Sequence, residues 1–161
     1  MKAISAAAVL GAVLFSQTSL AAEYTSITLE RPLNVSADEA WKQIMPFCLS
    51  LTRRGFVCDV VNGNGTDVGS VRSVNHGQIT ELIVGRTKYS VTYTFPAPNP
   101  TAYHATFEVV PEGPQKSKLV RTMFWDQAPL ATPEAKAADK AARTKNLTDT
   151  IDQMAKMAEG K

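Results

Sequence analysis

The chain has 161 residues, with 17 Lys and Arg against 15 Asp and Glu, 44% hydrophobic residues and two Cys. That length suits one globular domain, and the near-balanced charge argues against a dedicated nucleic-acid binder. A charged fraction of 20% argues against a disordered chain, and two Cys cannot supply a disulfide-dense scaffold or a four-thiolate zinc site.

Residues 1–21 have the pattern of a cleaved secretory signal peptide. Lys2 is followed by an apolar run from Ala3 to Phe15, and small residues stand at the cleavage positions Ser19 and Ala21. An apolar run of roughly 13 residues is too short for a membrane span, and the cleavage site lacks the Cys of a lipoprotein. We therefore expect an exported, periplasmic protein with no stable membrane anchor after cleavage. Its mature chain, 22–161, would form a single domain.

The mature chain opens with one strand and two short helices. Alternating apolar and polar residues predict a strand over 25–35. Ser36 and Glu39 then form a capping box, which begins a helix with apolar residues at three- and four-residue spacing. A second short helix is expected over 47–54, ended by Gly55.

The middle of the chain is a series of short strands separated by Gly-, Asn- and Pro-rich turns. Such spacing is typical of an antiparallel meander. Strands are predicted over residues 56–61, 68–75, 78–84, 88–95, 103–110 and 118–125.

One long helix ends the chain. Thr132 is its expected cap and Pro133 its first residue, and an apolar stripe that includes Ile151 and Met154 continues to Ala158. A coiled-coil seam is an alternative, but the alanine-rich first half favours close packing on a sheet. A helix of about 25 residues is roughly 37 Å long, enough to cover a small sheet.

The order and spacing of these segments resemble the START-like (SRPBCC) superfamily, in particular its polyketide cyclase/dehydrase and lipid-transport branch. The resemblance covers almost all of the mature chain. It is carried by residues 35–41 (VSADEAW), 68–72 (VGSVR), 80–84 (TELIV), 89–94 (YSVTYT), 103–107 (YHATF) and 124–126 (FWD).

The resemblance implies an α+β helix-grip fold, with a curved seven-stranded antiparallel sheet around the long C-terminal helix and two short helices after the first strand. Members of the superfamily bind lipids, sterols, plant hormones or polyketides in a hydrophobic pocket, and a minority catalyse cyclisation or dehydration. In the family, the glutamate of the Thr-Glu-Leu-type motif, here Glu81, often points into the pocket.

Strand alternation nominates the pocket walls. Large side chains share the apolar strand faces, and the long helix adds two more, although plain core packing explains each of them equally well. The candidates are Tyr89, Tyr93, Tyr103, Met123, Trp125, Ile151 and Met154.

Three charged residues lie within predicted strands. Glu81 and Arg121 share a register with apolar neighbours, and Arg72 lies in an earlier strand. A buried carboxylate needs a partner, which a guanidinium supplies through paired hydrogen bonds. We expect Glu81 to pair with Arg72 or Arg121 and to anchor polar groups of a ligand; three independent solvated charges are the alternative.

Cys48 and Cys58 would form a disulfide in an oxidising compartment, or remain two buried thiols. His76 and His104 lack a second ligand at helical or hairpin spacing, so no metal site is expected. No cofactor motif occurs either.

The leading functional hypothesis is an exported binding protein that holds a hydrophobic or aromatic small molecule or lipid in an internal pocket. An enzyme of the cyclase/dehydrase type, with Glu81 as general acid and base, is the alternative. A third possibility is a domain whose interior is simply filled. We expect a hydrophobic small-molecule partner, no nucleic acid and no cofactor, and a monomer or weak dimer.

Overall fold

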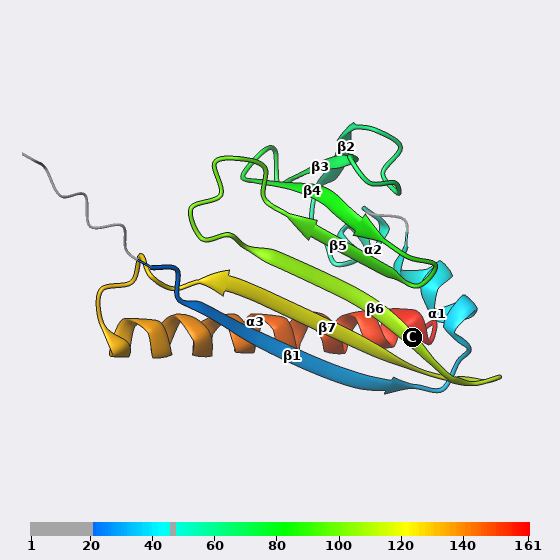
Figure 1. The fold of residues 1–161 in the computed structure, drawn as a ribbon. Helices are drawn as coiled ribbons and strands as arrows, with labels where there is room; N and C mark the ends of the chain where they lie inside the picture. The colour runs from blue at the N-terminus through cyan, green and yellow to red at the C-terminus, as the bar shows by residue number, and fades with distance from the viewer. Residues whose placement is uncertain (1–20, 46–47) are drawn as a thin grey trace, which may run out of the picture.

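The computed structural model describes residues 21–45 and 48–161, so the predicted signal peptide lies outside the described residues except for Ala21. Seven strands and three helices make up the described chain (Figure 1). In order they are β1 (Tyr24–Leu33), α1 (Ala37–Ile44), α2 (Leu49–Arg53), β2 (Cys58–Asn62), β3 (Val71–Val74), β4 (Ile79–Arg86), β5 (Ser90–Thr94), β6 (His104–Gly113), β7 (Lys116–Asp126) and α3 (Pro133–Ala158).

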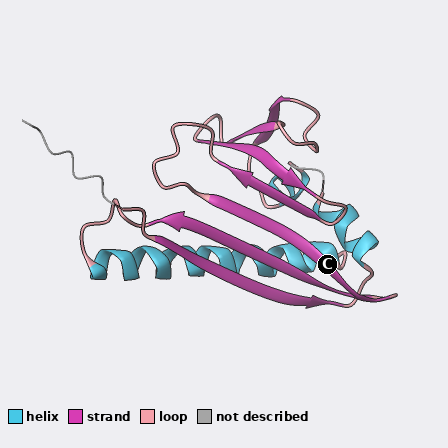
Figure 2. Ribbon diagram, viewed as in Figure 1, coloured by secondary structure: helices cyan, strands magenta, loops and turns pink. Residues whose placement is uncertain are grey.

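The strands form a single antiparallel sheet in the order β1-β7-β6-β5-β4-β3-β2. Each strand from β2 to β6 therefore pairs with the next in sequence, and β1 pairs with β7. Figure 2 shows α3 lying along one face of this curved sheet, with the two short helices grouped at one end. This is the helix-grip fold that the START-like resemblance implies. None of the helices in the described part of the chain is long and apolar enough to span a membrane.

Capping side chains set the helix boundaries. The Ser36 hydroxyl accepts from the Glu39 backbone N–H at 3.3 Å, and the Glu39 carboxylate accepts from the Ser36 N–H at 3.2 Å, which completes the predicted capping box. Thr132 caps α3 through the N–H of Ala135 at 3.1 Å. Gly55 follows α2 with φ of +84°, a conformation that glycine adopts at little cost.

All seven strands differ from their predicted bounds by a few residues, and two of them differ most. β6 continues through Pro111 to Gly113 instead of ending at Val110. Proline has no N–H to donate, and the strand accommodates it with a register shift between Pro111 and Gly113. β3 begins only at Val71, because the preceding residues fold into a hydrogen-bonded loop.

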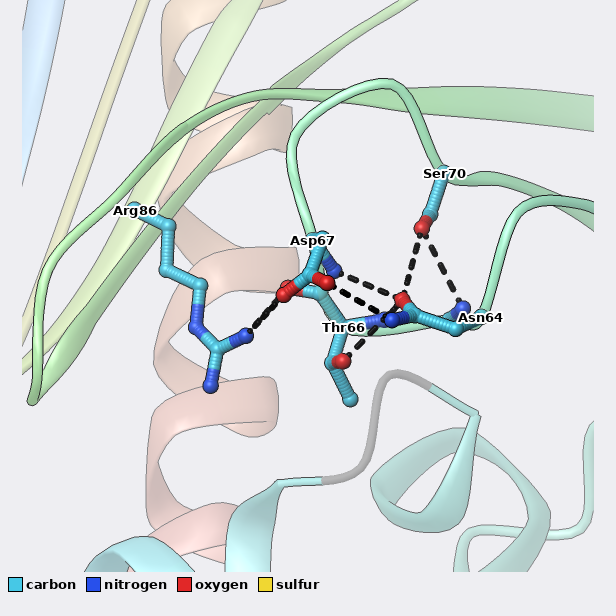
Figure 3. A network of polar contacts seen from close by, with 6 residues as sticks. Asn64, Thr66, Asp67, Ser70 and Arg86 are labelled. Carbon is cyan, nitrogen blue, oxygen red and sulfur yellow. Dashed lines mark hydrogen bonds and ion pairs between the residues drawn. The ribbon is translucent and has the colours of Figure 1, made fainter.

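That loop, residues 64–70, is organised by Asn64 (Figure 3). The Asn64 side-chain oxygen accepts from the backbone N–H groups of Thr66 and Asp67, both at 2.9 Å, and from the Ser70 hydroxyl at 3.2 Å. Arg86 in β4 then binds the Asp67 carboxylate at 2.6 Å. The ion pair with Arg86 thus fixes this β2–β3 loop against the end of β4.

The core lies between the sheet and α3, in two clusters of buried apolar side chains. One surrounds Tyr93, Trp125 and Leu147. The other joins Leu33 and the buried face of α1 to the C-terminal half of α3. The stripe on α3 is therefore buried against the sheet and α1 only from Leu147 to Ala158. The alanine-rich first half does not pack closely on the sheet as expected, since Ala137 and Ala141 are exposed.

Candidate ligand-binding cleft

A cleft separates the inner face of the sheet from the middle of α3. It consists of two adjoining hollows, of about 160 and 310 Å³, that share four residues: Ile79, Glu81, Arg121 and Thr150. A third hollow, of about 20 Å³, extends from the first toward α1 and shares the Arg72 and Tyr93 walls. The three hollows adjoin one another through these shared residues.

Apolar and aromatic side chains line most of this space. The ring of Tyr103 stacks on that of Phe95 with centroids 4.3 Å apart, and Met123 and Leu147 lie beside them. At the other end, Met154 of α3 and Phe107 of β6 line the smallest hollow. Apolar and aromatic walls are typical of small-molecule sites, and this cleft adds an unusually large number of charged groups to them.

An ion pair between Arg72 and Glu81 forms part of the wall. The two residues face each other across β3 and β4, and their side chains are only 7% and 10% exposed. Nε of Arg72 donates to Oε2 of Glu81, and Nη2 lies against the same oxygen. The guanidinium also lies 5.2 Å from the centroid of the Tyr93 ring. The pairing of Glu81 with Arg72 is thus one of the two that the sequence predicts.

Arg121 contributes a second guanidinium to the same space. It faces Phe107 across β6 and β7, and its Cζ lies 4.3 Å from the centroid of the Phe107 ring. Nη2 donates to the Tyr93 hydroxyl at 3.1 Å. Nε and Nη1 are buried and have no hydrogen-bond partner among the described residues. The residue as a whole is 9% exposed.

Arg54, the residue directly after α2, forms a further part of the cleft wall. Its Nε donates to Gln153 at 2.9 Å and its Nη2 to the Thr150 hydroxyl at 3.1 Å. Burial lowers the pKa of the Arg54 guanidinium, and the positive charges of Arg121 and Arg72 lower it further. The three guanidinium groups thus lie close enough to repel one another.

Burial also raises the pKa of the Tyr103 hydroxyl well above its ordinary value, and the nearby Tyr93 adds to the effect. Tyr103 lines the larger hollow. It therefore stays neutral at physiological pH.

The structure brings most of the predicted site residues together in the cleft. Those that line it are Arg72, Glu81, Tyr93, Tyr103, Arg121, Met123 and Met154.

Tyr89, Trp125 and Ile151 lie outside the cleft, contrary to expectation. Tyr89 precedes β5, so strand alternation does not direct it inward, and its hydroxyl donates to Asp38 at 2.8 Å. Trp125 lies near the end of β7, where its Nε1 donates to Asp139 of α3 at 2.8 Å. Ile151 is fully buried in the core cluster under α1.

Sequence reasoning missed Arg54, Phe107, Arg143 and Thr150, which also line the cleft. Phe107 shares a strand face with Tyr103, so the alternation that nominated Tyr103 could have found it. Arg54 and Thr150 give no comparable signal, because their positions depend on how α2 meets α3.

A disulfide between Cys48 and Cys58 ties α2 to β2, with Cα atoms 5.4 Å apart. The intervening segment includes Leu51 and Phe56, which line the cleft. In the described part of the chain, no group of three or more His, Cys, Asp or Glu side chains could hold a metal ion.

No protein-family model matches this chain, and no curated protein matches it in sequence. Solved structures do match in fold. A solution NMR structure of a Thermobifida fusca protein is similar with a TM-score of 0.67 and 18% identity, over 83% of this chain and 92% of that one. A Nitrosospira multiformis protein matches with a TM-score of 0.61 and 16% identity, over 81% and 94%.

Norcoclaurine synthase from Thalictrum flavum, in complex with dopamine and hydroxybenzaldehyde, matches with a TM-score of 0.61 and 17% identity, over 96% of each chain. These likenesses show a shared fold, so the helix-grip architecture expected from the START-like resemblance is confirmed. At such low identity they carry the fold alone.

Proposed function

We propose that the protein is an exported, periplasmic binding protein that holds a hydrophobic or aromatic small molecule or lipid in the cleft between the sheet and α3. The observation that carries the proposal is the set of adjoining hollows lined by Tyr93, Phe95, Tyr103 and Phe107. Helix-grip neighbours with bound aromatic compounds, such as the norcoclaurine synthase complex, support a binding role for this space.

Binding is favoured over catalysis because the cleft engages Glu81 in an ion pair with Arg72. That pair gives the carboxylate a structural partner, whereas a general acid and base must exchange protons with a substrate. Export rests on the pattern of residues 1–21. It predicts a mature N-terminus at Ala22 in the periplasmic fraction, which N-terminal sequencing checks.

Two measurements test the binding role. Native mass spectrometry of protein isolated from its own periplasm should reveal a retained small molecule. Fluorescence titration with N-phenyl-1-naphthylamine, a neutral apolar probe, should show saturable uptake by the ligand-stripped protein.

The substitution Asn146→Trp places a large ring at the mouth of the cleft, where Asn146 lies exposed on α3. It should reduce uptake of the probe. Lys145→Trp is the matched control, because Lys145 is the neighbouring residue on the same helix and points into solvent with 80% of its side chain exposed. Equal uptake by both variants would place the probe elsewhere, and no uptake by the unaltered protein would overturn the proposal.

A further inference from the structure

We propose that the cleft takes an anionic amphiphile, an apolar or aromatic body that carries one carboxylate, and that Arg121 binds the carboxylate. The inference rests on the proposed binding function and adds the chemical class of the ligand. Its starting point is the guanidinium of Arg121, which is more than nine-tenths buried and lines both larger hollows of the cleft.

The hydrogen bonds of Arg121 are incomplete. A guanidinium has five N–H donors, one on Nε and two on each terminal nitrogen. Only Nη2 has an acceptor, the Tyr93 hydroxyl, while Nε and Nη1 have none among the described residues. Leaving a buried charged donor without an acceptor is costly, so such a group calls for a ligand atom or a water.

The charged groups around the cleft determine which ligand charge is favoured. The charged groups in its walls are four guanidinium groups and one carboxylate, on Arg54, Arg72, Arg121, Arg143 and Glu81. Glu81 is engaged by Arg72, and Arg143 is engaged by Asp139 at 3.0 Å. Positive charge therefore remains at Arg121 and Arg54, which favours an anion over a neutral or cationic ligand.

The side chains around Arg121 indicate which anionic group and which apolar body the ligand would carry. The Phe107 ring covers one face of the guanidinium at 4.3 Å, which leaves its edges for hydrogen bonding. A carboxylate matches such an edge with two parallel hydrogen bonds. Beyond it, Tyr103, Met123 and Leu147 provide the apolar wall that a ring or chain would contact.

Calorimetric titration of the ligand-stripped protein with a matched pair of probes tests the inference. The probes are 2-naphthoate and 2-naphthalenemethanol, which share one ring system and differ in carboxylate against hydroxymethyl. A charge-assisted hydrogen bond predicts that 2-naphthoate binds about tenfold to a hundredfold more tightly. Arg121→Met should abolish that preference.

Lys118→Met is the matched control for loss of one positive charge. Lys118 lies on the same strand, three residues from Arg121, and is paired with Glu30 at 3.0 Å. Its removal should leave the preference for 2-naphthoate unchanged.

The outcomes separate the two proposals. If both probes bind equally, the carboxylate inference fails while the binding function stands, and a water satisfies Arg121. If neither binds, both proposals fail. If the preference persists in Arg121→Met, another cation carries it and the assignment to Arg121 is overturned. Should that variant not fold, the probe pair on the unaltered protein still decides the ligand class.

Discussion

Arg72 and Glu81 occupy directly opposed positions on β3 and β4 and form an ion pair that is almost completely buried in the cleft wall. Removing one partner from such a pair leaves an uncompensated buried charge. The pair therefore ties the shape of the cleft to the stability of the β3–β4 hairpin.

Glu81→Leu or Arg72→Leu alone should each lower the free energy of unfolding by about 3–5 kcal/mol, and the double variant should lose less than the sum of the two. Urea unfolding measures all three. Lys145→Ala, which removes the exposed pair with Asp149, is the control and should change stability little. Additive losses in the double variant would contradict a direct coupling.

The disulfide predicts a dependence of stability on oxidation. Replacing both Cys48 and Cys58 by Ser opens a loop of about ten residues. The double variant should lose roughly 2–3 kcal/mol in free energy of unfolding. Urea unfolding of the unaltered protein under reducing conditions should give the same midpoint as the double variant. If the reductant also shifted the urea midpoint of the double variant, its effect on the unaltered protein could not be assigned to the disulfide.

Asp139 predicts a pH dependence of stability. Burial alone would raise the pKa of Asp139, but hydrogen bonds from Arg143 and Trp125 lower it overall. A carboxyl whose folded-state pKa is lowered stabilises the fold above its unfolded value of about 3.9, and this contribution is lost as the pH falls through the folded-state pKa.

Asp139→Asn should therefore be less stable than the unaltered protein at pH 7, and the difference should shrink below about pH 4. Unfolding midpoints in urea between pH 7 and pH 3 check this. Asp149→Asn, on an exposed face of the same helix, is the matched control. A difference that stays constant with pH would show that Asp139 acts only through packing.

Alanine substitutions at two glycines distinguish the cost of backbone strain from the cost of a steric clash. Gly63 has φ of +75°, and a Cβ there would lie 2.6 Å from Oγ and 2.9 Å from Cα of Ser70. Gly69 has φ of +92° with no atom within 4 Å of such a Cβ. Gly69→Ala should cost about 1–2 kcal/mol from its backbone conformation, and Gly63→Ala should cost more. Thermal unfolding ranks them, and equal losses would refute a role for the close approach to Ser70.

Local signals in the sequence predicted the elements that have strong boundaries. The helix over 133–158 begins and ends where Thr132, Pro133 and the apolar stripe place it. Alternation also placed Arg121 among the apolar residues of β7. Pro111 was misleading, because a strand can accommodate proline where its register shifts.

The chemistry of the cleft depends on contacts between distant segments and could be predicted only in part. Pairing of Glu81 with an arginine was expected, but which arginine follows from the β3–β4 register. That Nε and Nη1 of Arg121 have no hydrogen-bond acceptor among the described residues could not be inferred. It depends on the positions of all the acceptors around the side chain, which only the folded structure gives. Arg54 enters the site through the packing of α2 against α3, which carries no sequence pattern.

The bond between Cys48 and Cys58 has a consequence for affinity as well as for unfolding. It restrains the segment that carries Leu51, Arg54 and Phe56 into the cleft wall. The conformational entropy of ordering that wall is then lost when the disulfide forms during maturation, and not when a ligand arrives. The oxidised protein thus presents a preorganised wall, and the proposed ligand should bind more weakly to the reduced protein.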